Sequence, residues 1–332
     1  MDAKVVIADL QLLCAASMYG FGFAAQRAAM IEGMGPLTFN ACRYIVSMII
    51  LAFMMPILSP KTKDKEEEEI SLQIQMESAR KDSLEKKEAS ESQKAWMYGL
   101  TLAFLNFGAS TFQQIGIQYI SASEAAFVTG FYIVFCPFMS MLFPALAGGH
   151  KPKWNTWLAV LGSMIGLFII SDADLSDLGL GKGELYTIIC SFFWTLHIMF
   201  TDYATNQVDA VYLTFVQFIG TASMTSLLSF YFEYSEWNRR HIWDSWHVIL
   251  LLGVMECLGF TIGAIGQTNA PSFHAAIIYG SEAVFATLGG FFFLGESFTM
   301  REWIGCALML TSTIVAKIDF DVEPHKKGGV KD

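Results

Sequence analysis

The sequence predicts an all-α integral membrane protein with ten transmembrane helices, arranged as two inverted five-helix repeats. Three observations support this fold class. First, 54% of the 332 residues are hydrophobic and only 16% are charged, whereas soluble domains are about 45–50% apolar and about 25% charged. Second, ten apolar runs reach or approach the length that a helix needs to cross the bilayer. Third, the pattern of the chain repeats once.

The ten apolar runs follow one another along nearly the whole chain. The first begins close to Met1, and its flank holds one Asp and one Lys, which is weak for a signal peptide, so we interpret it as an uncleaved first helix. The fifth and tenth are the shortest. Glycines inside the runs allow helices to approach closely in a membrane. The runs are 7–27, 36–58, 95–117, 123–146, 155–171, 183–201, 209–233, 247–267, 273–294 and 300–317.

The distribution of Lys and Arg predicts the orientation. With ten spans and a cytoplasmic amino terminus, the inside segments hold fifteen Lys and Arg residues and the outside segments hold five. Basic residues favour the cytoplasmic side, so both termini are expected there. A plasma membrane and an organellar membrane fit this pattern equally.

One long polar insertion, 59–94, interrupts the first half of the chain. It mixes eight basic with ten acidic residues, a composition that cannot bury a core, so we expect a disordered or partly helical cytoplasmic loop. The tail 318–332 is expected to be cytoplasmic as well. These boundaries predict a first repeat at 1–171, which includes the insertion, and a second repeat at 182–317.

The internal repeat is visible around two glycines. Residues 125–135, with Gly130 near the centre, align with residues 275–285 around Gly280 at a constant offset of 150. Five spans repeated once give ten, and an odd number per repeat inverts the second copy. Inverted repeats are typical of alternating-access carriers, whose site lies between the halves near the midplane.

Ionisable residues inside the runs are the sharpest candidates for function, because charge is costly in hydrocarbon. Arg43 lies in the second run and Glu282 in the ninth, while His197 and Glu256 lie mid-span. A buried carboxyl favours its neutral form, so Glu282 is expected to exchange a proton. The predicted proton relay consists of His197, Glu256 and Glu282. Snorkelling of Arg43 and purely structural hydrogen bonds of the others are the alternatives.

Neutral polar and aromatic residues complete the predicted substrate cavity. Packing between helices is the alternative role for the aromatic rings. The predicted cavity residues are Tyr19, Arg43, Gln113, Tyr132, Trp194, Gln217, Tyr279 and Glu282.

Several short motifs, taken together in order, resemble the EamA family of the drug/metabolite transporter superfamily. Ala283 stands where the family often has Pro, and Gly148-Gly149-His150 replaces a Gly-Glu turn. The resemblance implies a cavity lined by helices one to four and six to nine. The motifs are Tyr19-Gly20, Gly35-Pro36-Leu37-Thr38-Phe39 and Arg43 in the first copy, and Ser281-Glu282-Ala283-Val284-Phe285, Phe293-Leu294-Gly295-Glu296 and Trp303-Ile304-Gly305 in the second.

The sequence thus predicts a secondary transporter of a small metabolite that works by alternating access. A nucleotide-sugar or other organellar metabolite carrier of the same superfamily is the first alternative, and a membrane-embedded receptor or enzyme is a weaker one. No catalytic motif, cofactor or metal site is predicted. The expected partners are a small-molecule substrate and the lipid bilayer, with no nucleic acid. Two GxxxG patterns, at 162–166 and 259–263, favour internal packing and are also compatible with a homodimer.

Overall fold

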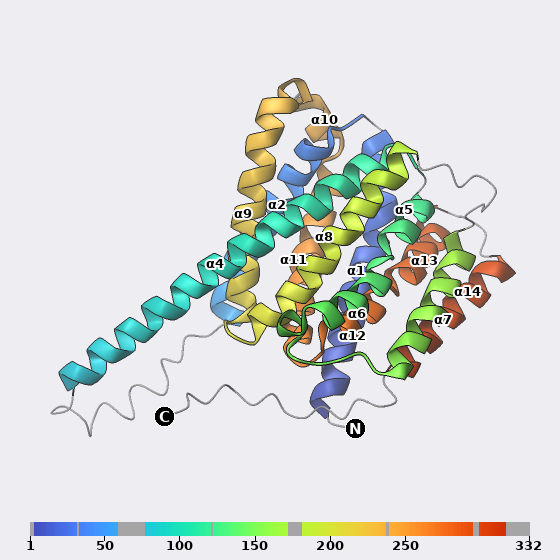
Figure 1. The fold of residues 1–332 in the computed structure, drawn as a ribbon. Coiled ribbons are helices and arrows are strands. Elements are labelled where there is room, and N and C mark those ends of the chain that lie inside the picture. The colour runs from blue at the N-terminus through green and yellow to red at the C-terminus, as the bar shows by residue number, and fades with distance from the viewer. Residues whose placement is uncertain are drawn as a thin grey trace.

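The structure, a computed structural model, describes residues 3–31, 33–58, 77–120, 122–171, 181–236, 239–294 and 299–316 (Figure 1). Throughout these ranges the fold is helical and has no strand, so the predicted all-α class is confirmed. The longer helices are α1 (Ala3–Ile31), α2 (Pro36–Leu58), α4 (Glu77–Ile117), α5 (Ala122–Thr129), α6 (Tyr132–Leu142), α7 (Trp154–Ser171), α8 (Lys182–Thr205), α9 (Ala210–Phe232), α11 (Trp246–Gln267), α12 (Ser272–Tyr279), α13 (Glu282–Leu294) and α14 (Met300–Val315). Short helical turns lie at Pro144–Ala147, Tyr234–Glu236 and, as α10, Arg239–Asp244.

Seven helical segments in the described ranges are long and apolar enough to cross a membrane, which makes the chain a multi-pass membrane protein. The other three predicted spans correspond to α4, to α12 with α13, and to α14. The membrane part of α4 carries three polar amide side chains. The helices α12, α13 and α14 have only 8, 13 and 16 residues, so each is short for a membrane span. The count of ten spans therefore stays a prediction. The seven segments are Ala3–Arg27, Pro36–Leu58, Glu124–Leu142, Trp154–Ser171, Lys182–Thr205, Ala210–Phe232 and Trp246–Gln267.

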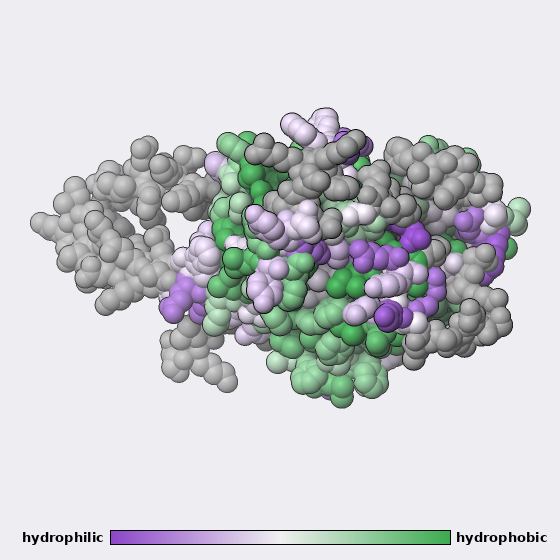
Figure 2. Space-filling model, turned by 90° about the horizontal axis from the view of Figure 1, so that it is seen from above, coloured by the Kyte–Doolittle hydropathy of each residue, from purple (hydrophilic) through white to green (hydrophobic). Residues whose placement is uncertain are grey.

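The outer surface of the bundle is apolar. Large side chains such as Phe53, Leu227 and Phe292 are exposed, which is unfavourable in water and favourable against lipid. Viewed from above, apolar residues cover the left-central and lower parts of the visible face, and a group of hydrophilic residues lies right of the centre (Figure 2). Exposed tryptophans at helix ends, including Trp154 and Trp246, suit the interface between lipid and water.

The second half of the polar insertion is helical. Residues 77–94 form the start of α4, which has 41 residues and projects from the bundle at its amino-terminal end (Figure 1). The remainder of the insertion, 59–76, and the predicted tail 318–332 lie outside the described residues.

The predicted fourth and ninth spans are not continuous helices. The first is split into α5 and α6 by Gly130 and Phe131, and the second into α12 and α13 by Gly280 and Ser281. The two breaks are separated by the same 150 residues as the sequence repeat. Hydropathy alone predicted unbroken spans because it does not register the backbone turn at these positions. Each break leaves a half-helix that begins inside the protein.

Helix pairs surround the centre of the molecule. In one group α1 packs against α11 and α13, α2 against α9, and α4 against α8. In the other, α7 and α14 pack against each other at one side of the bundle (Figure 1). There a Cβ on Gly166 would come within 2.6 Å of Met309, so glycine permits the close approach. The predicted GxxxG at 162–166 thus faces another helix of the same chain.

Candidate functional site

A cavity lies in the middle of the bundle. Nine helices line it: α1, α4, α5, α6, α8, α9, α11, α12 and α13. Both breaks reach it, because Thr129, Tyr132, Tyr279 and Glu282 are all lining residues. None of the lining residues lies on α7 or α14, and α2 supplies none directly. The cavity therefore draws on both halves of the chain.

Seven of the eight predicted cavity residues line this space, and so do His197 and Glu256 of the predicted relay. The exception is Arg43, which stands behind the wall. The seven lining residues are Tyr19, Gln113, Tyr132, Trp194, Gln217, Tyr279 and Glu282.

Arg43 forms a buried ion pair with Glu256. Its Nη1 atom lies 2.8 Å from Oε1 of Glu256, and the Arg43 side chain is only 1% exposed. The rings of Phe39 and Tyr44 flank the guanidinium, with centroids 5.4 and 5.0 Å from its central carbon. Guanidinium groups interact favourably with aromatic faces. The positive charge of Arg43 is thus balanced within the protein, and Glu256 stands between it and the cavity.

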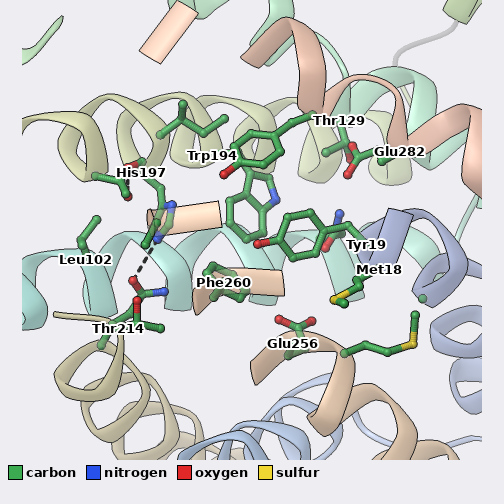
Figure 3. Close-up of a pocket in the computed structure, with 18 of the residues that line it drawn as sticks. Met18, Tyr19, Leu102, Thr129, Trp194, His197, Thr214, Glu256, Phe260 and Glu282 are labelled. Carbon is green, nitrogen blue, oxygen red and sulfur yellow. Dashed lines mark hydrogen bonds between the residues drawn. The ribbon is translucent and has the colours of Figure 1, made fainter. Parts of the chain in front are cut away.

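Glu282 stands at the break between α12 and α13. It is the first residue of α13, where the helix dipole favours negative charge. The hydroxyl of Tyr132, the first residue of α6, donates a 2.8 Å hydrogen bond to its Oε1 atom. Thus the two half-helices that begin inside the bundle meet through this bond. Glu282 is 7% exposed, and Figure 3 shows its carboxyl at the cavity near Thr129.

His197 contacts neither predicted relay partner through a hydrogen bond in the described structure. Its Nε2 atom is 3.2 Å from Oε1 of Gln217, drawn as a dashed line in Figure 3. Glu256 pairs with Arg43 and Glu282 with Tyr132. The three relay residues share the cavity but have separate partners, so a relay among them stays a prediction.

Aromatic rings form the central wall of the cavity. The ring of Tyr19 lies 5.5 Å from that of Phe260 and 5.9 Å from that of Tyr279, and Trp194 lies 5.9 Å from Phe260. Tyr19 also interacts electrostatically with both Glu256 and Glu282. Figure 3 accordingly shows the two carboxyls on different sides of the Tyr19 ring.

Phe260 was missed by the sequence analysis. The neighbouring glycine pattern at 259–263 is the signal that could have found it. A Cβ on Gly259 would come within 2.8 Å of Tyr19, and one on Gly263 within 2.6 Å of the Tyr279 hydroxyl. These glycines make room for cavity aromatics, and the pattern therefore marks the cavity wall on α11.

Close packing also fixes α1 beside Glu282. A Cβ on Gly20 would collide with the carbonyl oxygen of Glu282 and come within 2.7 Å of Cβ of Phe285. Only glycine permits this approach of α1 to the backbone of α13. The position of Tyr19 against Glu282 follows from that contact.

Polar contacts join the two halves of the chain near both ends of the bundle. At the end where α1 begins, Nε2 of His274 lies 2.9 Å from Oδ1 of Asp9, and both residues are buried. At the other end, the backbone N–H groups of Leu37 and Thr38 donate to the carboxylate of Glu233 at 3.0 and 2.7 Å. Asp9 and His274 join α1 to α12, and Glu233 joins α9 to the start of α2.

Metal-ligating groups do not cluster in the part of the chain that the structure describes. There, no set of three or more His, Cys, Asp or Glu side chains is arranged to hold a metal ion. All six cysteines are free.

A multi-pass helical bundle with a central cavity drawn from both halves is the architecture of a membrane transporter. The chain belongs to the EamA-like transporter family, which matches residues 83–172 and 181–317. It is 23% identical over 327 residues to a protein of Archaeoglobus fulgidus described as an uncharacterized transporter, covering 95% of this chain and 87% of that one.

Two further similarities agree with this family. An uncharacterized inner membrane transporter of Salmonella typhimurium, YicL, is 26% identical over 230 residues, which cover 66% of this chain and 72% of that protein. One crystal structure shares the fold with a TM-score of 0.68 at 15% sequence identity, covering 95% of this chain and 97% of that one. The comparisons support a membrane transporter.

Proposed function

We propose that the protein is a secondary carrier that moves a small metabolite across the membrane by alternating access. In this proposal its ten transmembrane helices form two inverted five-helix repeats, and both termini face the cytoplasm. The observation that carries the proposal is the central cavity, which is lined by helices of both halves and by both broken spans. A site at the midplane between two halves is the arrangement that rocking carriers use.

The contacts at the two ends supply the gates of this mechanism. The Asp9–His274 pair closes the end where α1 begins, and Glu233 closes the other end against Thr38. These contacts are local and polar, so each can separate without disturbing the apolar core. Opening one pair while the other holds exposes the cavity to one side at a time.

The lining argues against a nucleotide-sugar substrate. Among the lining residues that the structure describes there is neither Lys nor Arg, and phosphate groups are recognised mainly by those side chains. A small amphipathic metabolite fits the aromatic and amide lining better.

Reciprocal accessibility tests the mechanism without a known substrate. In a variant with all six cysteines replaced, Asp9→Cys and His274→Cys are joined by a short bifunctional reagent. Two reporters are added one at a time: Gln26→Cys, and Thr201→Cys at the Asp9 end. Asp9 and Gln26 are roughly 25 Å apart along α1 at about 1.5 Å per residue.

Cross-linking should block labelling of position 201 from the Asp9 side and speed labelling of position 26 from the opposite side. The uncross-linked variant with each reporter is the control. If cross-linking leaves the rate at position 26 unchanged, the two ends are not coupled and alternating access is wrong.

A further inference from the structure

The described lining of the cavity carries acidic side chains but neither Lys nor Arg. Its two carboxyl groups belong to Glu256 and Glu282. Arg43 pairs with Glu256, and His274 pairs with Asp9. Glu282 takes part in neither.

Arg43 is not presented to a ligand. Its side chain is 1% exposed, its Nη1 atom is 2.8 Å from Glu256, and Phe39 and Tyr44 cover it with their rings. An anionic ligand would have to displace Glu256 into an apolar surrounding, which leaves an uncompensated buried charge. The arrangement therefore disfavours the anionic substrate that an intramembrane arginine first suggests.

Glu282 has a neutral hydrogen-bond partner. The hydroxyl of Tyr132 donates to one of its oxygens and supplies no positive charge. Its place at the start of α13 stabilises the ionised carboxylate without neutralising it. A buried carboxyl without a charged partner either keeps its proton or is ionised and paired with a bound cation.

The wall next to Glu282 suits an organic cation. The ring of Tyr19 lies 5.5 Å from that of Phe260 and 5.9 Å from that of Tyr279, and Trp194 packs on Phe260. Aromatic faces attract a cation within about 6 Å of the ring centroid, and quaternary ammonium groups are recognised in this way. The same rings offer an apolar surface to the uncharged part of a ligand.

We propose that the substrate is a small organic cation, an amine or quaternary ammonium compound with an aromatic or aliphatic part, whose positive charge is held by Glu282 within this aromatic wall. This inference rests on the proposed carrier function, since it assigns the substrate class of the same cavity. Glu256 holds Arg43, and Glu282 provides the charge for the ligand.

Three probes of nearly equal shape test the assignment. N-methyl-4-phenylpyridinium carries a fixed positive charge, 4-phenylpyridine is neutral at mildly alkaline pH, and biphenyl-4-carboxylate is negative. Binding of each to the purified full-length protein in detergent is measured by calorimetry. The cation should bind at least about tenfold more tightly than either of the others, because attraction to a carboxylate and to aromatic faces in a desolvated site contributes a factor of at least that order.

Variants then locate the charge. Glu282→Gln should weaken binding of N-methyl-4-phenylpyridinium at least about tenfold, whereas Glu282→Asp should retain part of it. The matched control is Glu184→Gln, which removes a carboxyl from the first turn of α8 outside the cavity lining and should leave binding unchanged. Thermal unfolding of each variant verifies that it is folded.

The proposal is overturned if the carboxylate or the neutral probe binds as tightly as the cation, if none of the three binds, or if Glu282→Gln and Glu184→Gln weaken cation binding equally. None of these results touches the carrier mechanism, which the accessibility experiment tests without any ligand. If the accessibility experiment shows that the two ends are coupled but no cation binds, the proposed substrate class is wrong and the proposed carrier mechanism stands.

Discussion

At the scale of single residues, the buried ion pair of Arg43 and Glu256 illustrates a structural role for charged groups inside the membrane. Each partner alone would be strongly unfavourable in hydrocarbon, and together they balance. The pair holds α2 against α11 at the cavity wall. Its role is to support the site, and Glu282 is left as the carboxyl that a ligand can reach.

Arg43→Ala should therefore act mainly on stability. Removing one partner of a buried pair typically costs about 3–5 kcal/mol, so thermal unfolding in detergent should move down by several degrees. The double variant Arg43→Leu/Glu256→Leu should regain much of that loss, because no unpaired charge remains. If the single variant unfolds at the wild-type temperature, the pair does not support the fold.

Glu282→Gln should remove the pH dependence of transport. A proton and a cation compete for the same carboxylate, so uptake of N-methyl-4-phenylpyridinium into proteoliposomes should fall on acidification in the wild type. The titratable groups that interact with Glu282 are Tyr19, Tyr132 and Cys190, whose ordinary forms remain protonated at neutral pH. The residual uptake of the variant should be flat with pH. A variant that keeps the wild-type profile would place the titration elsewhere.

At the scale of helices, the feature that builds the site is the pair of interruptions in the fourth and ninth predicted spans. They bring the starts of α6 and α13 into the bundle, where Tyr132 and Glu282 meet. Contact with α1 then depends on Gly20, whose neighbours on α13 include the backbone of Glu282 itself. A small residue on one helix thus sets the position of a carboxyl on another.

Gly20→Ala should separate α1 from α13. The added methyl group meets backbone atoms that cannot move aside, and overpacking of this kind costs about 1–3 kcal/mol. Gly22→Ala, two residues along the same helix, is the matched control, because its nearest neighbour is the flexible end of Leu252 at 3.2 Å. Thermal unfolding in detergent should fall for position 20 and change little for position 22. Equal effects at both positions would refute the role of Gly20.

The amino-acid sequence predicted most of the named cavity residues but not which of these side chains pair with one another. Hydropathy located the apolar runs. Glu282 and Glu256 stood out because an ionisable group inside the hydrocarbon layer is unfavourable in free energy. The partner of Arg43 was not predictable, because residues far apart in the chain come together only through helix packing. The breaks were missed since the mean hydropathy of each run stays high around Gly130 and Gly280, and a backbone turn leaves no trace in hydropathy.

At the scale of the whole molecule, the ends of the bundle differ in chemistry. One is joined by a carboxyl and an imidazole, Asp9 with His274, and the other by the carboxylate of Glu233 at the start of α2. The excess of Lys and Arg in the segments at the end from which α4 projects predicts that this end faces the cytoplasm.

Arg80→Cys in the cysteine-free variant tests that orientation, because position 80 lies in the projecting part of α4. An impermeant maleimide should label it in inside-out vesicles and not in intact cells. A cysteine at position 240, in α10 at the opposite end, should show the reverse pattern. Labelling of position 80 in intact cells would show that the predicted orientation in the membrane is wrong.

The single carboxylate left for a ligand also determines how transport responds to voltage. A monovalent cation bound to Glu282 leaves no net charge at that site, and so does a proton bound there in its place. A cycle that carries the cation one way and a proton the other therefore displaces no net charge, although each elementary charge crossing roughly 100 mV is worth about 2.3 kcal/mol. Uptake of N-methyl-4-phenylpyridinium into proteoliposomes should then be insensitive to an imposed potassium diffusion potential and should follow an imposed pH gradient. A current that scales with uptake would show that a second charge travels with the cation.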